Sequence, residues 1–416
     1  MDTVLLMKIG ELVTLAGPAR ARRGAEMREL GILHDAAVFV SDGRIAEVGP
    51  SPDLEARHRD VAVTLDLTGK VVVPGFVDAH THALFAGSRE DELEWKREGL
   101  SYREIAARGG GIASTVKKTR EAPDDVLRRE TLGRLRSMLR HGTTTAEVKS
   151  GYGLSVDQEV RSLTLLSQMQ DAAIEIVPTF LGAHALPPEF EGRPDAYADL
   201  VAGPMLEEVA RKTAARFCDV FVEDGYFTSD QGRRILLAAR RYGLDARVHA
   251  DELTACGGAE LAADVGAVTA DHLVHSTNAG LKEMAARRVI AVLLPGTSFT
   301  SRLPYADARR LLGLDLAVAL GTDLSPNSWI ESLQTVISIA VHHSGLSAAE
   351  ALTAVTVNGA YAVGKGGECG TIETGKRADL LVLDLPNHRH LGYRHGDSVE
   401  MVLSQGRVVH RRALPG

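Results

Sequence analysis

Over the first 70 residues, hydrophobic positions alternate with polar ones in short runs, which predicts strands joined by turns. Residues 37–40 and 44–48 flank the sequence Ser41-Asp42-Gly43, which is typical of a hairpin turn. The pattern changes at about Val71, where apolar runs of strand length begin to alternate with longer helical stretches. This alternation predicts repeated βα units and therefore a parallel sheet.

Eight apolar runs in this middle region have the length and composition of buried strands. They are residues 71–76, 143–149, 174–181, 217–222, 245–249, 270–274, 289–294 and 317–321. Helical stretches lie between them, for example at residues 125–139, 157–169, 205–216 and 230–242. Eight such strands over roughly 250 residues predict a (β/α)8 barrel of the TIM type.

The chain returns to a strand pattern near its C-terminal end. Residues 379–384 form one predicted strand, and residues 399–403 and 408–410 form a hairpin. Because neither β-rich end supplies enough strands for its own core, we expect both ends to join in one small β-sandwich. The predicted α/β architecture thus has a composite sandwich domain (residues 1–70 and 366–416) and a barrel domain (residues 71–365).

Composition and charge narrow the functional classes. A net charge of -8 and an aromatic content of 5% argue against a nucleic-acid binder, which needs a basic surface or aromatic stacking residues. No uncharged apolar stretch reaches the ~18 residues that a membrane-spanning helix requires, and no basic region precedes the apolar start. The three widely spaced cysteines (Cys218, Cys256 and Cys369) are expected to be reduced thiols of a cytoplasmic protein.

Four side chains at predicted strand ends have the chemistry of a metal site. His80 and His82 follow the run that begins at Val71, and side chains two apart on a strand face the same side. His249 ends another strand, and Asp323 follows a third. Catalytic residues of such barrels lie at the C-terminal ends of several strands, so the four are expected to converge. Three imidazoles and a carboxylate suit zinc and also ferrous iron.

Three groups near this predicted metal site could move a proton during hydrolysis. Glu252 lies just after His249, and His272 follows Asp271 at another strand end. Either can take a proton from water and deliver it to a leaving nitrogen, whereas Asp323 is expected to serve primarily as a ligand. His272 also fits two other roles, as a further ligand or as a packed core histidine. The sequence does not rank these alternatives.

The order of these motifs resembles the amidohydrolase superfamily. The likeness is carried by Pro74-Gly-Phe-Val-Asp-Ala-His80-Thr-His82, then His249, His272 and Asp323, and by residues 375–384, where that superfamily re-enters its small β-domain. More specific segments resemble one branch, the imidazolonepropionase family. They are residues 80–89, 101–102, 109–112, 147–153, 180–185 and 249–252. The likeness extends over nearly the whole chain.

This resemblance implies a reaction, a metal and a set of contacts. The reaction is hydrolysis of the ring C–N bond of 4-imidazolone-5-propanoate to N-formimidoyl-L-glutamate in histidine degradation, by a homodimer acting on this small molecule. The resemblance also implies one zinc or iron ion per subunit. The implied metal ligands are His80, His82, His249 and Asp323, and the implied substrate contacts are Arg89, Tyr102, Tyr152, His184 and Glu252.

The residue types suit these roles. Arg89 offers a planar fork for the propanoate carboxylate, and Tyr152 lies between two glycines on a turn from which its hydroxyl can reach a ligand. His184 can polarise the ring carbonyl or bind a ring nitrogen. Lys149 also ends a predicted strand. Some members of the superfamily bridge two metals with a carboxylated lysine, but this branch is mononuclear and Lys149 is expected to be structural or to support the ligands.

One loop departs from the family pattern. After the metal aspartate the family reads Asp-x-Asn-Pro-Gly-Ser or Thr, whereas this chain reads Asp323-Leu-Ser325-Pro-Asn327-Ser328. That loop touches the substrate in the family, so Ser325, Asn327 and Ser328 are expected to contact it here. Asn327 adds bulk where glycine leaves the backbone accessible. Two alternatives stay open: another amidohydrolase acting on a small heterocycle (a deaminase or cyclic-amide hydrolase), and a catalytically silent scaffold.

Overall fold

The computed structural model describes residues 3–100, 104–105, 108–169 and 173–413. Eight strands at its centre pair in parallel in consecutive order. They are β8 (Phe76–Asp78), β9 (Thr143–Lys149), β10 (Glu175–Ala183), β11 (Phe217–Val222), β12 (Asp245–Ala250), β13 (Thr269–His272), β14 (Ile290–Leu293) and β15 (Val318–Leu320). Backbone hydrogen bonds from Asp323 N to His80 O (3.0 Å) and from His82 N to Leu324 O (2.9 Å) nearly close the sheet into a barrel. The predicted fold class is confirmed.

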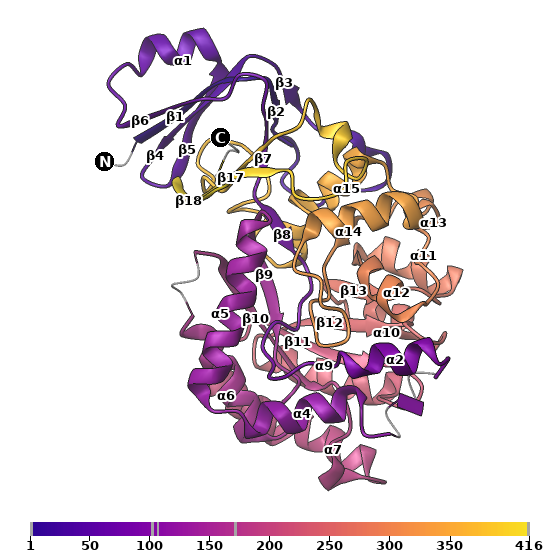
Figure 1. Cartoon of the computed structure of the whole chain (residues 1–416). Helices are drawn as coiled ribbons and strands as arrows, with labels where there is room; N and C mark the ends of the chain where they lie inside the picture. The colour runs from indigo at the N-terminus through magenta and orange to yellow at the C-terminus, as the bar shows by residue number, and fades with distance from the viewer. Residues whose placement is uncertain (1–2, 101–103, 106–107, 170–172, 414–416) are drawn as a thin grey trace.

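Helices surround the barrel and alternate with its strands along the chain (Figure 1). They are α2 (Asp91–Arg97), α4 (Gly111–Glu121), α5 (Asp124–Arg140), α6 (Val156–Ser167), α7 (Pro194–Leu200), α8 (Leu206–Lys212), α9 (Ser229–Arg241), α10 (Gly258–Asp264), α11 (Asn278–Arg287), α12 (Pro295–Ser301), α13 (Ala308–Gly313), α14 (Leu333–Ile339), α15 (Ala348–Ala354) and α16 (Val357–Ala362). The predicted helices 125–139, 157–169 and 230–242 are found as α5, α6 and α9. The helix predicted at 205–216 is shorter, because Thr213 is extended and the chain then leads into β11.

The first predicted barrel strand, residues 71–76, is wrong. Val71–Pro74 forms β7, which pairs with β16 and β2 in a different sheet, and the barrel strand β8 begins only at Phe76. The chain passes from one sheet to the other at Gly75, whose N–H donates to Asp379 O (2.8 Å) and where a Cβ would lie 2.2 Å from Thr144 Oγ1. The apolar pattern runs through this crossing because both strands are buried on all sides.

Two further sheets lie beside the barrel, one built from N-terminal strands alone and one from strands of both chain ends (Figure 1). One sheet contains β1 (Thr3–Ile9), β4 (Ala36–Ser41), β5 (Arg44–Pro50) and β6 (Val63–Asp66), with α1 (Ser51–Arg57) packed against it. The other contains β2 (Glu11–Val13), β3 (Ile32–Leu33), β7 (Val71–Pro74), β16 (Leu380–Leu383), β17 (Val399–Ser404) and β18 (Arg407–Arg411). Both predicted hairpins are present, as β4–β5 and β17–β18.

One apolar core joins these two sheets. Leu6 and Val38 from the first pack in the same cluster as Leu380 and Met401 from the second. This shared core supports the composite domain, and we propose that its first segment ends at the β7–β8 crossing rather than at residue 70.

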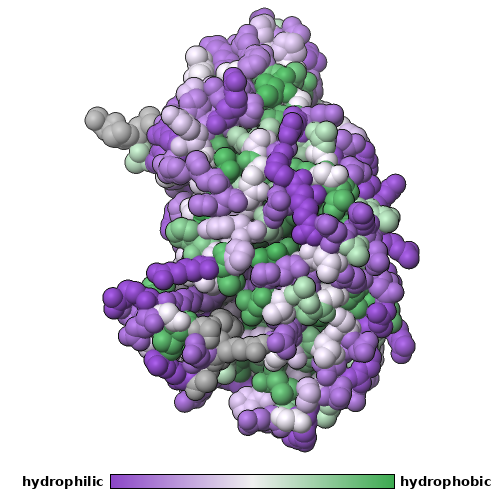
Figure 2. All heavy atoms as spheres, turned by 90° about the vertical axis from the view of Figure 1, so that its right-hand side faces the viewer, coloured by the Kyte–Doolittle hydropathy of each residue, from purple (hydrophilic) through white to green (hydrophobic). Residues whose placement is uncertain are grey.

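The face of the molecule drawn in Figure 2 has no large continuous apolar area among the residues described. In Figure 2, hydrophobic residues on the side shown are distributed in small groups among hydrophilic ones. Within the described ranges, the helices are all too short or too polar to cross a membrane.

Candidate active site

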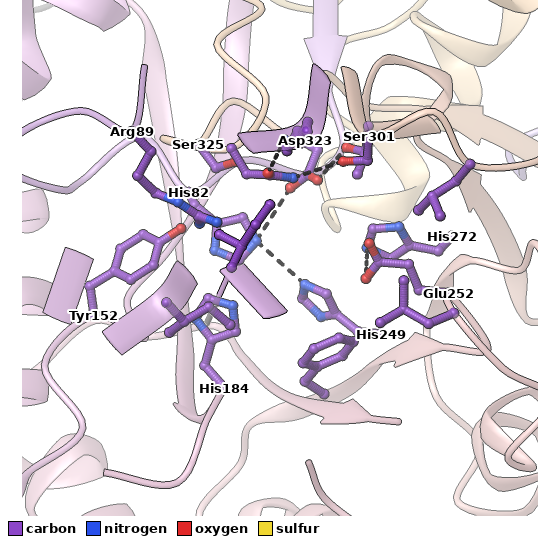
Figure 3. A pocket seen from close by; sticks show the side chains of 18 of the residues that line it. His82, Arg89, Tyr152, His184, His249, Glu252, His272, Ser301, Asp323 and Ser325 are labelled. Atoms are coloured by element: carbon purple, nitrogen blue, oxygen red, sulfur yellow. Dashed lines mark hydrogen bonds and ion pairs between the residues drawn. The ribbon is translucent and has the colours of Figure 1, made fainter. Parts of the chain in front are cut away.

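A cavity of about 370 Å³ opens at the C-terminal ends of the barrel strands, where the predicted site residues gather (Figure 3). Its lining includes His82, Arg89, Tyr152, His184, His249, Glu252, His272, Asp323, Ser325 and Asn327. His80 is fully buried beside the lining histidines. Ser328 is also fully buried, outside the lining of this cavity. Tyr102 lies outside the described residues, so its contact stays a prediction.

The four predicted metal donors lie close together, in two overlapping sets. His80, His82 and Asp323 offer ligand atoms within 4.8 Å of one another, and so do His80, His249 and His272. Nε2 of His82 lies 3.3 Å from Nε2 of His80 and 3.4 Å from Nε2 of His249. Oδ1 of Asp323 lies 3.5 Å from His80 Nε2 and 3.4 Å from His82 Nε2. Tetrahedral ligands at metal–ligand distances of about 2.0–2.1 Å are separated by about 3.3–3.4 Å. The donor set therefore fits a single metal ion of that size.

A buried carboxylate lies on the far side of two imidazoles and influences which nitrogen faces this site. Nδ1 of His80 lies 2.6 Å from Oδ2 of Asp271, and Nδ1 of His249 lies 3.0 Å from Oδ2 of Asp219. The carboxylate of Asp271 only accepts, so Nδ1 of His80 carries the proton and its Nε2 presents a lone pair. The negative charge of Asp219 beside Nδ1 of His249 favours the same tautomer there.

The two carboxylates are in turn held by buried cations: Lys149, which was expected to be structural or to support the ligands, and Arg247, which sequence analysis did not assign to the site. Lys149 Nζ lies 2.8 Å from both Glu147 Oε1 and Asp219 Oδ2, and Arg247 Nη2 donates to Asp271 Oδ2 (3.0 Å). All five side chains are fully buried inside the barrel. The signal in the sequence was a charged residue within an otherwise apolar strand, because such a charge needs a partner in the interior.

Asp323 and Glu252 are acids in a buried environment. Asp323 accepts a hydrogen bond from Thr297 Oγ1 through Oδ2, which leaves Oδ1 toward the histidines, and burial raises its pKa to about 6. Burial raises the pKa of Glu252 to about 8, with further contributions from the charges of Asp323 and Glu223. Glu252 Oε2 lies 3.6 Å from Nε2 of His272, which also lines the cavity.

The tautomer of His184 follows from one contact. Its Nδ1 lies 2.9 Å from the backbone oxygen of Gly151, which only accepts, so Nδ1 carries the proton. Burial lowers the pKa of His184 to about 3, so the ring is neutral and its Nε2 can only accept a hydrogen bond. This tautomer favours contact with an N–H group of a ligand over donation to a ring carbonyl.

Glu159 supports this side of the cavity and was not predicted. Its fully buried carboxylate accepts hydrogen bonds from the backbone N–H groups of Gly151 (3.0 Å), Gly153 (2.9 Å) and Leu154 (2.8 Å). The loop it holds carries Tyr152, whose ring lies 5.2 Å from that of His184. In the sequence Glu159 looks like an ordinary acid in the first turn of a helix.

Arg89 and the loop after Asp323 have more hydrogen bonds within the protein than the sequence suggested. Nε and Nη2 of Arg89 each donate to the carboxylate of Glu92 at 2.7 Å. One edge of the guanidinium group, which was expected to bind the substrate carboxylate, is therefore already paired. The loop after Asp323 is closed by hydrogen bonds from Ser325 N to Ser328 O (3.0 Å) and from Ser328 N to Ser325 Oγ (3.2 Å). Ser328 thus shapes the loop that brings Ser325 to the cavity.

Known proteins are similar to this chain in sequence and in fold. The amidohydrolase family matches residues 71–409, and an imidazolonepropionase-like composite domain of bacteria matches residues 36–60. An imidazolonepropionase of Geobacillus kaustophilus is 45% identical over 416 residues, covering 98% of each chain. One of Clostridium tetani is 40% identical over 414 residues, covering 99% of each. The crystal structure of a zinc-bound adenosine deaminase from Xanthomonas campestris superposes with a TM-score of 0.69 at 21% identity, over 97% of this chain and 92% of the other, which shows a common fold.

Proposed function

The chain belongs to the imidazolonepropionases within the amidohydrolase family, and from this membership we propose how its cavity carries out their hydrolysis. Water adds to the ring carbonyl carbon of 4-imidazolone-5-propanoate, and the bond between that carbon and the ring nitrogen breaks. The nitrogen takes up a proton, which gives N-formimidoyl-L-glutamate. The observation that carries the proposal is that His82 lies within 3.3–3.4 Å of His80, His249 and Asp323, in a cavity whose wall also contains Glu252.

His80, His82, His249 and Asp323 would hold one zinc or iron ion per subunit. Bound there, such an ion would act as a Lewis acid that lowers the pKa of water from 15.7 toward about 7. The protein contributes fixed imidazole tautomers through Asp271 and Asp219, and Thr297 orients the carboxylate of Asp323.

Glu252 is the group best placed to move the proton. Both oxygens of Asp323 are directed elsewhere, one to Thr297 and one to the histidines, which leaves Glu252 and His272 on the wall of the cavity. Glu252 accepts a proton from the attacking water and gives it to the leaving nitrogen. His272 is neutral because burial holds its pKa well below the usual range, so it can orient Glu252 or the water by hydrogen bonding.

The remaining wall residues bind and orient the substrate. His184 accepts a hydrogen bond from a ring N–H group, and Tyr152 packs beside it. Arg89, oriented by Glu92, lies on the side that we assign to the propanoate tail. Ser325 and Asn327 form part of the same wall, and Ser328 supports their loop. The predicted contacts of Tyr102 remain part of this proposal.

The working context of the enzyme is also a proposal. Cys218, Cys256 and Cys369 are free thiols, which supports function in the reducing cytoplasm. The net charge of -8 gives no basis for a nucleic-acid partner. We propose a homodimer, in keeping with the family.

The decisive experiment is hydrolysis of freshly generated imidazolone propanoate, followed by loss of its ultraviolet absorbance, together with elemental analysis of the metal. We expect turnover that is lost on chelation and returns with zinc or iron. A full equivalent of metal without turnover would reject this substrate and favour a deaminase or cyclic-amide hydrolase acting on another heterocycle. Metal binding without turnover of any cyclic amide or amidine would favour a silent scaffold.

A further inference from the structure

A lysine that sequence analysis did not single out lines the wall of the cavity. Lys96 lies on α2 and is half-buried, and its Nζ donates to Oδ1 of Asn327 at 2.8 Å. Nδ2 of Asn327 donates in turn to Oγ of Ser301 on α12 (3.1 Å). Asn327 therefore connects α2 with α12 along the cavity wall. This connection holds the Lys96 ammonium at the cavity.

The charges along this wall are unequal. Arg89 and Glu92 form a buried, doubly hydrogen-bonded ion pair, which is neutral as a unit. Within the described part of the chain, Lys96 has no carboxylate at ion-pair distance, and its ammonium donates to the neutral amide of Asn327. Burial lowers the pKa of Lys96, and the nearby positive charge of Arg89 lowers it further, although Glu92 opposes this. A half-buried cation in this setting is stabilised by any anion that enters the cavity.

We propose that Lys96, held in place by Asn327, contacts the free carboxylate of the substrate and determines specificity for an anionic tail. The inference rests on the proposed function, since a substrate with a carboxylate supplies the missing anion. A neutral heterocycle would leave the ammonium half-desolvated without an anionic partner, which penalises its binding. The contact lies away from the scissile bond, so it acts equally in the ground state and the transition state and affects KM rather than kcat.

The test compares three variants on two substrates. The substrates are imidazolone propanoate and its propanamide, in which the tail is neutral. Lys96→Met removes the charge and keeps much of the stem, Lys96→Arg keeps the charge, and Arg97→Met is a control on the same helix at an exposed position. We expect Lys96→Met to lower kcat/KM for the acid on the order of 10- to 100-fold, through KM, and to leave the amide nearly unchanged. Lys96→Arg should restore most of the preference, and Arg97→Met should match the wild type on both substrates.

Equal losses on the acid and the amide, or no loss on either, would overturn the assignment. Elemental analysis of each variant checks that the metal site is intact. Calorimetry with the unreactive 3-(imidazol-4-yl)propanoate and its amide separates this inference from the proposed function. If the wild type prefers the acid and Lys96→Met does not, Lys96 is correctly assigned even if imidazolone propanoate is not turned over. If imidazolone propanoate is turned over but neither assay shows a role for the charge, the inference about Lys96 fails alone.

Discussion

Asp271 Oδ2 lies 2.6 Å from Nδ1 of His80, on the side of the imidazole that faces away from the other metal donors. Both side chains are fully buried, and Arg247 donates to the same carboxylate oxygen. Asp271 therefore fixes the proton on Nδ1 and makes Nε2 a stronger electron donor, a role that such partners have in many metal sites. A second carboxylate, Asp219 on β11, lies 3.0 Å from Nδ1 of His249 on the neighbouring strand β12.

Asp271→Asn should weaken metal binding without removing a ligand. An amide can still contact His80, but it lacks the charge that increases the basicity of the imidazole. We expect metal affinity to fall on the order of 10- to 100-fold, measured by competition with a chromogenic chelator. Asp264→Asn on the surface of α10 is the control and should keep wild-type affinity. An unchanged affinity in Asp271→Asn would show that the contact does not tune the site.

His249→Ala should abolish metal retention and activity together, because it removes one of four converging donors. Elemental analysis of the purified variant and the ultraviolet assay measure the two effects. His275→Ala is a matched control, because His275 follows the neighbouring barrel strand β13 and does not line the cavity. A full equivalent of metal in His249→Ala would reject His249 as a ligand.

The rate should rise with pH if Glu252 takes the proton from water. Only the deprotonated carboxylate can act as a base, and burial raises the pKa of Glu252 to about 8, so the active fraction grows as the pH increases through that range. A metal beside Asp323 would offset one of the negative charges that raise this pKa. We therefore expect the midpoint of the acid limb of kcat/KM between the ordinary carboxyl range and about 8.

Glu252→Gln checks that assignment. It should lower kcat on the order of 10²- to 10⁴-fold and remove the acid limb from the residual activity, while metal content stays unchanged. A residual activity that keeps the same limb would assign the titration to another group, with His272 as the next candidate.

The sequence predicted the parts of this site that depend on local pattern. His80 and His82 share a face because they are two residues apart, and His249 and Asp323 were found because strand ends are recognisable from apolar runs. The barrel strand beginning at Phe76 was misplaced, since burial on both sides of Gly75 makes two strands look like one.

The supporting charges could not be paired from the sequence. Asp219 lies opposite Arg247, and His249 lies opposite Asp271, but this register depends on how neighbouring strands are staggered around the barrel. The bridge from Lys96 through Asn327 to Ser301 joins segments that are more than 200 residues apart at its first contact. No local pattern encodes such a contact, because it arises from the way α2 packs over the barrel.

Glu159→Gln should loosen the loop that carries Tyr152. The carboxylate accepts three backbone N–H groups, whereas an amide supplies one oxygen and places its own N–H₂ group toward a donor. Leaving buried donors unpaired costs about 1–3 kcal/mol, so we expect a lower Tm. KM should also rise, because Gly151 no longer holds His184 in place. Asp157→Asn, at an exposed position on the same helix, should change Tm only slightly and leave KM unaltered. A lower Tm with an unchanged KM would mean that Glu159 stabilises the fold without positioning His184 or Tyr152.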